Sequence, residues 1–212
     1  MSLTMNRVDT LADHILAAPR KSKRRLVALA GAPGSGKSTL AETLAQALTA
    51  RGATAQVVPM DGFHLDNRIL TALDLLNRKG APETFDVTGF ARLMQALGSD
   101  TPVYYPLFDR TRDIAIAGAG HLEDDCDTVI VEGNYLLLDA DHWRSLSTFW
   151  DVRVRLDVDL PTLRQRLIDR WLDEGLTEHA AIARAEGNDL RNAQLIQSNA
   201  LPCDVIFDAS GS

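Results

Sequence analysis

The nine residues "GAPGSGKST" (31–39) restrict the possible folds of this chain more than any other stretch. They follow the short apolar run "LVALA" (26–30) and lead into "KSTLAETLAQALTA" (37–50), where apolar residues recur at helical spacing. A buried strand, a glycine-rich turn and a helix in this order, with the pattern G-x-x-x-x-G-K-[ST] across the turn, predict a phosphate-binding loop in an α/β fold.

The residue types in this loop have a specific chemistry. Glycines let successive backbone N–H groups point at phosphate oxygens, and the helix N-terminus adds a partial positive charge. Lys37 can reach the β- and γ-phosphates, and the Ser38 hydroxyl can bind Mg²⁺, so ATP and Mg²⁺ are the implied cofactors. A flexible glycine turn, the simpler alternative, does not explain a Lys-Ser pair at the start of a helix. The predicted nucleotide-binding residues are Gly31, Ala32, Pro33, Gly34, Ser35, Gly36, Lys37, Ser38 and Thr39.

Strand and helix patterns alternate along the chain. Alternation of this kind predicts a parallel sheet with helices on both faces, and 212 residues suit one domain, here residues 1–212. The basic stretch "RKSKRR" (20–25) is expected to be a solvated linker. The expected strands are residues 26–30, 55–60, 127–133, 149–158 and 203–208, and the expected helices are residues 8–18, 37–50, 66–76, 88–97 and one that opens at Asp159 and Pro161.

Two of the expected strands stop at an acid. Asp61 follows "VVPM", and Glu132 follows "VIV". Ligands of parallel α/β sheets bind at the carboxyl ends of the strands, and we expect both acids there, on strands that neighbour the loop strand. Asp61 and Glu132 could help Ser38 to hold Mg²⁺, and Asp61 could accept a proton from an attacking hydroxyl. The alternative for Asp61 is a plain turn or helix-cap residue.

Four further stretches of the chain resemble a known family. The stretches "MDGFH", "RKGAPETFD" (78–86), "VIVEGNYLLLD" and "RQRLIDR" (164–170) occur in the order found in P-loop small-molecule kinases. These include uridine kinase, phosphoribulokinase and bacterial pantothenate kinase, and the sequence is most similar to a short bacterial branch named as fructose transport system kinases. The resemblance implies a three-layer P-loop NTPase sandwich with a mostly parallel sheet. It also implies that Asp61 is the base and that Glu132 acts with Mg²⁺.

The same resemblance implies a helical lid over residues 159–196. Arg166 and Arg170 are four residues apart and share one helix face, whereas Arg164 lies off that face. Their guanidinium groups would neutralise charge on the transferring phosphoryl group, and Gly175 and Gly187 could let the lid bend. The alternative is an ordinary charged helix surface.

The residues that would bind the acceptor depart from the uridine kinase pattern. Uridine kinases carry an Asn-aromatic-Asp-His-Pro stretch whose acid helps to hold the ribose, and here Gly80 of "RKGAP" replaces that acid. Phe85 could equally belong to the core, and Tyr104 to an apolar hairpin. Arg110 or Arg112 in the pocket would favour an acceptor that bears an anion. The candidate acceptor residues are His64, Arg78, Lys79, Phe85, Asp86, Tyr104, Asp109, Arg110 and Arg112.

We therefore predict a kinase that transfers the γ-phosphoryl group of ATP to a hydroxyl of a small metabolite. A fructose-type sugar or a nucleoside is the favoured acceptor, pantothenate is an alternative, and a regulatory NTP-binding ATPase without an acceptor is the rival from another class. A net charge of −7 argues against nucleic acid or an anionic membrane as partner. The absence of an apolar run of membrane-spanning length, and Cys126 and Cys203 as reduced thiols, suit a cytoplasmic monomer or homodimer.

Overall fold

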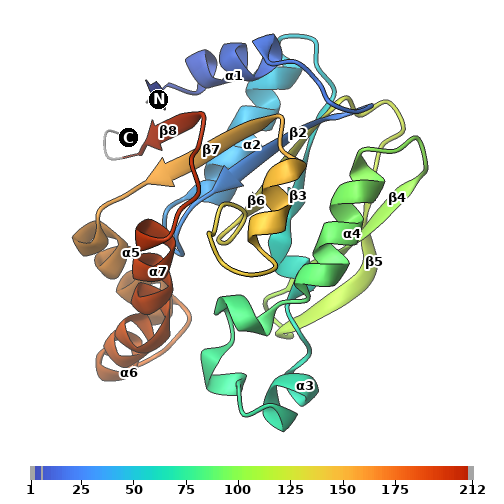
Figure 1. The fold of residues 1–212 in the computed structure, drawn as a ribbon. Coiled ribbons are helices and arrows are strands. Elements are labelled where there is room, and N and C mark those ends of the chain that lie inside the picture. The colour runs from blue at the N-terminus through green and yellow to red at the C-terminus, as the bar shows by residue number, and fades with distance from the viewer. Residues whose placement is uncertain (1–2, 6, 210–212) are drawn as a thin grey trace.

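The computed structural model describes residues 3–5 and 7–209, which form a sheet of six parallel strands between layers of helices (Figure 1). The strand order is β1-β8-β7-β2-β6-β3, and every pairing within this sheet is parallel. The predicted α/β fold is confirmed. The strands are β1 (Leu3–Met5), β2 (Arg25–Ala30), β3 (Ala55–Pro59), β6 (Thr128–Gly133), β7 (Val152–Asp157) and β8 (Val205–Asp208).

Each face of the sheet has its own apolar core. All residues of β2 and β6 are buried, as expected for parallel strands that are covered on both sides. Leu26 and Ala28 of β2 pack against helix α4 (Val87–Leu97), while Val27 and Leu29 pack against helices α1 (Val8–Ala17) and α2 (Lys37–Thr49). The alternating side chains of one strand thus hold the three layers together.

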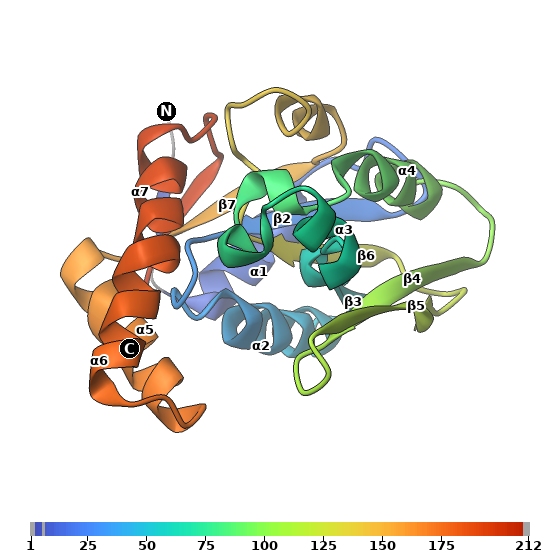
Figure 2. The same ribbon diagram turned by 90° about the horizontal axis from the view of Figure 1, so that it is seen from below.

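The helical region after β7 forms a separate bundle beside the sheet (Figure 2). It begins at Asp159, whose carboxylate accepts a hydrogen bond from the backbone N–H of Thr162, with Pro161 in the first turn. Gly175 follows the first helix at φ 89°, and Gly187 lies in a π-helical turn. The elements are α5 (Leu160–Asp173), α6 (Glu178–Arg184), the π-helical turn η5 (Ala185–Asp189) and α7 (Leu190–Ser198).

The remaining elements lie outside the central sheet. Strands β4 (Val103–Asp109) and β5 (Ile114–Leu122) pair with each other as an antiparallel hairpin. Helix α3 (Asn67–Ala72) is shorter than the predicted helix 66–76, because Asp74 adopts a left-handed φ of 57°. Four 3₁₀ turns complete the described chain: η1 (Met60–Phe63), η2 (Leu76–Arg78), η3 (Pro82–Thr84) and η4 (Arg144–Thr148).

The prediction of a solvated linker at 20–25 is wrong for its last two residues. Arg24 and Arg25 are only 1% and 7% exposed. The Arg24 guanidinium donates to backbone carbonyls at the end of α4 and in the loop before β6, and Arg25 donates to carbonyls at the end of α1. These hydrogen bonds offset much of the cost of burial, although the Nε of Arg25 has no partner among the described residues, and they tie helix ends to the sheet.

Cys126 and Cys203, expected as thiols, are both buried. Among the described helices, none combines the length and the apolar character that a membrane crossing requires.

Candidate active site

The phosphate-binding loop joins β2 to α2 at the carboxyl edge of the sheet. Gly34 and Gly36 have φ angles of 76° and 87°, in the left-handed region that side-chain-bearing residues rarely adopt. The loop closes on itself through a hydrogen bond from the Ser35 N–H to the Ala32 carbonyl, and α2 begins at Lys37. This backbone curve at a helix N-terminus is the geometry that binds phosphate groups.

The two predicted acids lie at the same edge of the sheet. Glu132 is in register with Leu29 of β2 on one side and with Pro59 of β3 on the other. The expectation that both acids sit on strands next to the loop strand holds for Glu132 only, because β6 lies between β2 and β3. Asp61 nevertheless shares a cavity of about 160 Å³ with Lys37. We call this the inner cavity.

Glu132 fits a magnesium site. Its side chain is buried, and its Oε2 atom has no hydrogen-bond partner within the described residues. Burial raises the pKa of this carboxyl, as does the nearby charge of Asp61, while Lys37 and a hydrogen bond with Ser38 lower it. The described residues contain no cluster of three or more histidine, cysteine or acidic ligands. One carboxylate beside a hydroxyl suits Mg²⁺, because this ion usually takes its other ligands from phosphate and water.

Asp61 does not act as a helix cap. It lies in η1, and the residue whose carboxylate caps α3 is Asp66. The Asp61 carboxylate accepts a hydrogen bond from Arg110 Nη2 at 3.0 Å and faces the inner cavity. Gly62 lets the hairpin approach closely, because a Cβ there would lie 2.0 Å from the Pro106 carbonyl oxygen. The hairpin thereby brings Arg110 to Asp61.

His64 lies beside Asp61 as a neutral ring. Its Nδ1 is 2.7 Å from the Asp61 carbonyl oxygen, and its ring packs between Phe85 and Phe108 at centroid distances of 4.1 and 4.7 Å. Burial lowers the pKa of His64, against the opposing charge of Asp61. A carbonyl can only accept, so Nδ1 carries the proton and Nε2 is left as an acceptor.

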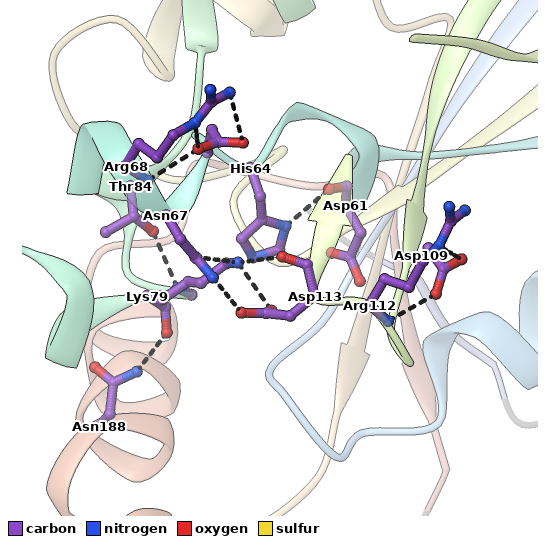
Figure 3. Close-up of polar contacts among 12 residues, drawn as sticks. Asp61, His64, Asn67, Arg68, Lys79, Thr84, Asp109, Arg112, Asp113 and Asn188 are labelled. Carbon is purple, nitrogen blue, oxygen red and sulfur yellow. Dashed lines mark hydrogen bonds and ion pairs between the residues drawn. The ribbon is translucent and has the colours of Figure 1, made fainter. Parts of the chain in front are cut away.

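Lys79 ties the hairpin to the rest of the pocket (Figure 3). Its ammonium donates to Asn67 Oδ1 at 2.6 Å and to the Asp113 carbonyl at 2.9 Å, and it pairs with the Asp113 carboxylate at 2.8 Å. Asn67 in turn donates to Asp113 at 2.8 Å. The network fixes the hairpin tip over the inner cavity, which His64, Lys79, Phe108 and Asp113 help to line.

The loop at 78–80 is also held by the helical region. The buried Asn188, in the π-helical turn, donates to the Lys79 carbonyl and accepts from Arg78 Nη1, both at 3.0 Å. The Tyr135 hydroxyl donates to the Gly80 carbonyl. Arg78 is therefore engaged by Asn188 and Glu83 and does not line the inner cavity.

Several other predicted acceptor residues lie outside this cavity. Phe85 is a core residue that touches the pocket only through the His64 ring. Asp86 caps α4 through the Gly89 N–H at 2.8 Å, and Tyr104 is 66% exposed on the hairpin. Asp109 and Arg112 pair with each other at 2.7 Å. Of the two hairpin arginines, the structure brings only Arg110 to the pocket.

Arg166 and Arg170, the two arginines of the predicted lid, face different cavities. Arg166 lies against the phosphate-binding loop, where its Nη1 is 3.4 Å from the Ser35 carbonyl oxygen. It lines a cavity of about 560 Å³ with Gly34, Thr39 and Phe207. Arg170 lines the inner cavity and pairs with Glu174 at 3.0 Å. Arg164 pairs with Glu186 and lines neither.

Seven residues that line the inner cavity were not among the predicted site residues. Asn134, two residues after Glu132, could have been found from its place at the strand end. Trp171 donates its indole N–H to Asp189 at 2.8 Å, and burial raises the pKa of Asp189. Trp171, Arg184 and Asp189 come from three different elements, α5, α6 and η5, so no single helical spacing in the sequence connects them. The seven are Gly80, Phe108, Asp113, Asn134, Trp171, Arg184 and Asp189.

Comparisons with known proteins agree with this geometry. The sequence model described as "Phosphoribulokinase / Uridine kinase family" matches residues 26–183. A crystal structure described as a "putative fructose transport system kinase" from Silicibacter sp. TM1040 is 56% identical, with a TM-score of 0.92. It covers 95% of this chain and 98% of that one.

Two curated relatives align over nearly the whole chain. "Putative uridine kinase C227.14" of Schizosaccharomyces pombe is 34% identical over 210 residues, which are 94% of this chain and 89% of that protein. "Uncharacterized protein YggC" of Escherichia coli is 38% identical over 202 residues, which are 92% of this chain and 83% of that protein.

Proposed function

The chain belongs to the phosphoribulokinase / uridine kinase family, and we propose that it transfers the γ-phosphoryl group of ATP to a hydroxyl of a small metabolite. One observation carries this proposal: Lys37 of the phosphate-binding loop and the carboxylate of Asp61 line the same inner cavity. A regulatory ATPase needs no carboxylate beside an acceptor pocket.

ATP would lie across the phosphate-binding loop. The backbone N–H groups and the N-terminus of α2 would hold the phosphates, and Lys37 would contact the β- and γ-phosphates. The cavity of about 560 Å³ that Arg166 lines together with Gly34 and Thr39 suits the nucleoside part of ATP. Arg170, which faces the inner cavity, would neutralise charge on the γ-phosphoryl group.

Mg²⁺ would be held by Ser38 and Glu132, with Asp61 near it. When bound, this ion supplies positive charge that neutralises the phosphate oxygens. The unpartnered Oε2 atom of Glu132 supports this assignment, because a buried carboxylate oxygen is costly without a donor or a cation.

Asp61 would act as the general base. The acceptor hydroxyl gives its proton to Asp61, its oxygen bonds to the γ-phosphorus, and the bond from that phosphorus to the β–γ bridging oxygen breaks to release ADP. For this, the Asp61 carboxylate exchanges its hydrogen bond from Arg110 for one from the acceptor. His64 Nε2 can accept a second hydrogen bond and orient the acceptor.

For the acceptor we propose a fructose-type sugar or a nucleoside, in line with the names of the two similar kinases. A pantothenate kinase-like activity is the alternative. Production of ADP from Mg·ATP, measured with sugars, nucleosides and pantothenate, tests both.

Lys37→Ala supplies the decisive control for this assay. We expect acceptor-dependent turnover to fall by orders of magnitude, because the charge at the β/γ-phosphates is lost. Lys23→Ala, at a partly exposed lysine paired with Asp100, should leave turnover unchanged. Near-normal turnover in folded Lys37→Ala protein would refute the proposed function.

A further inference from the structure

A second cavity adjoins the inner one on the side away from the phosphate-binding loop. It has a volume of about 630 Å³ and lies between the hairpin tip and the helical region. None of the described loop residues lines it, so a group bound there is separated from the ATP phosphates. We call it the outer cavity. Six residues line both cavities: Phe108, Arg110, Asp113, Arg170, Trp171 and Arg184.

Three of these shared residues are arginines that come from different elements. Arg110 follows β4, Arg170 is in α5, and Arg184 ends α6. The guanidinium carbons of Arg170 and Arg184 lie 5.0 and 5.2 Å from the centre of the Trp171 ring. Because Asp189 holds the indole N–H, Trp171 is a fixed platform that orients both guanidinium groups.

The carboxylates around the outer cavity are already engaged. Glu174 pairs with Arg170, and Asp113 pairs with Lys79. Across the described part of the chain, no carboxylate lies within ion-pair distance of Arg184. The Arg184 guanidinium lines the outer cavity and stacks on the Trp171 ring in a cation–π contact.

During the proposed reaction Arg110 also becomes free of a carboxylate partner and can bind an anion. In the structure its Nη2 donates to Asp61 at 3.0 Å. When Asp61 turns to an acceptor hydroxyl, Arg110 loses this partner. Two guanidinium groups, Arg110 and Arg184, then face one cavity, and guanidinium pairs bind phosphate and carboxylate groups with charge-assisted hydrogen bonds.

We propose that the acceptor carries an anionic group, a phosphate or a carboxylate, which Arg110 and Arg184 bind in the outer cavity while the reacting hydroxyl lies at Asp61. This inference rests on the proposed kinase function and narrows its substrate class. Among the sugars and nucleosides proposed above, it selects their phosphorylated forms, a sugar phosphate or a nucleotide, over the neutral compounds, and it adds hydroxy acids as candidates.

The test is ADP release from Mg·ATP with neutral and anionic acceptors in matched pairs. The pairs are fructose and its 1- and 6-phosphates, ribose and ribose 5-phosphate, uridine and uridine 5′-phosphate, and glycerol and glycerate. These pairs also separate a phosphate from a carboxylate as the recognised group.

Variants connect the preference to the two arginines. Arg110→Gln and Arg184→Gln should each raise the KM for the anionic acceptor by about 10–100-fold, the effect of losing one charge-assisted hydrogen bond. Arg184→Lys keeps the charge and should recover part of the loss. Arg112→Gln is the matched control, because Arg112 is on the same turn, is as exposed as Arg110 at 61%, and lines neither cavity.

Turnover confined to anionic acceptors, with KM effects at Arg110 and Arg184 only, supports the inference. Equal turnover of a neutral acceptor, or unchanged KM values in both variants, overturns the inference and leaves the kinase function standing. If no acceptor raises ADP release above the ATP-only rate, the proposed function fails and the inference falls with it.

Discussion

Replacing Glu132 by Gln should stabilise the nucleotide-free protein. Glu132 is 6% exposed, and its Oε2 atom lacks a hydrogen-bond partner among the described residues. Gln keeps the shape of the side chain and removes the charge. Because burial raises the pKa of Glu132 in the folded protein, the unfolded chain releases this proton at a lower pH than the folded protein does.

The sign and size of the effect follow from this shift. The ionised Glu132 destabilises the fold increasingly as the pH rises above 4.5, the ordinary glutamate value. The Gln amide keeps an unpartnered polar atom in the same place, so the gain is the extra cost of burying a charged instead of a neutral group, about 1–3 kcal/mol. For a chain of this length each kcal/mol changes Tm by about 2–4 °C, so Glu132→Gln should raise Tm by about 2–12 °C at pH 7.5.

Scanning calorimetry of nucleotide-free, EDTA-treated protein at pH 5 and pH 7.5 measures this effect. The stabilisation should be larger at pH 7.5 than at pH 5. Adding Mg²⁺ with a non-hydrolysable ATP analogue should then raise the Tm of wild type more than that of Glu132→Gln. Glu42→Gln, at an exposed position of α2, is the control and should change Tm little at either pH.

Two results would refute this reasoning. A Glu132→Gln protein that is less stable than wild type at pH 7.5 would show that the carboxylate is satisfied in the free protein. Equal stabilisation of both proteins by Mg²⁺ and the nucleotide analogue would show that Glu132 does not help to hold the metal.

Two further predictions concern the lid and the pocket. Arg170→Ala should lower kcat more than it raises the KM for ATP, because the Arg170 guanidinium faces the inner cavity and would act mainly in the transition state. Arg164 pairs with Glu186 outside the cavity, so Arg164→Ala should change neither kcat nor KM. A lower Tm with unchanged kinetics in Arg170→Ala would show that Arg170 has only a structural role at the surface. The pKa of His64 is lowered by burial, so wild type should lose stability as the pH falls below about 6.5, where the unfolded chain binds the proton more readily. In scanning calorimetry between pH 7.5 and pH 5, the Tm of His64→Gln should therefore fall less than the Tm of wild type. An equal fall in Tm for the two proteins would contradict the assignment of His64 as a neutral, buried ring.

The local part of the site is predictable from the sequence. Strand β2, the phosphate-binding loop and α2 are consecutive, so composition and spacing define them together. Glu132 is recognisable because it directly follows the apolar run 129–131 near the end of β6. In these cases the signal lies within about ten residues of chain.

Non-local features are not predictable in this way. The position of β3 beyond β6 depends on strand pairing across more than 60 residues, so Asp61 lies one strand farther from the loop than expected. Arg24 and Arg25 resemble surface charges in the sequence, yet both are buried and donate to backbone carbonyls, which for Arg24 are more than 70 residues away along the chain.

The outer cavity shows the same limit. Arg110 and Arg184 meet there because the hairpin packs over η1 and α6 packs against α5. Neither packing contact can be derived from the spacing of residues in the sequence. Lys79 and Asp113, 34 residues apart, hold the hairpin in that place.

The central claim is that Asp61 takes the acceptor's proton during phosphoryl transfer. Its most direct test is the transfer of radiolabelled γ-phosphate from Mg·ATP to the acceptor by wild type and by Asp61→Asn. Asn keeps the size and hydrogen-bonding reach of Asp, and ATP binding should persist because the loop and Lys37 hold the nucleotide. We predict a folded, ATP-binding variant whose transfer rate is lower by at least ~10²-fold, the usual cost of losing a general base. A rate within a few-fold of wild type would show that the acid at the end of β3 is structural.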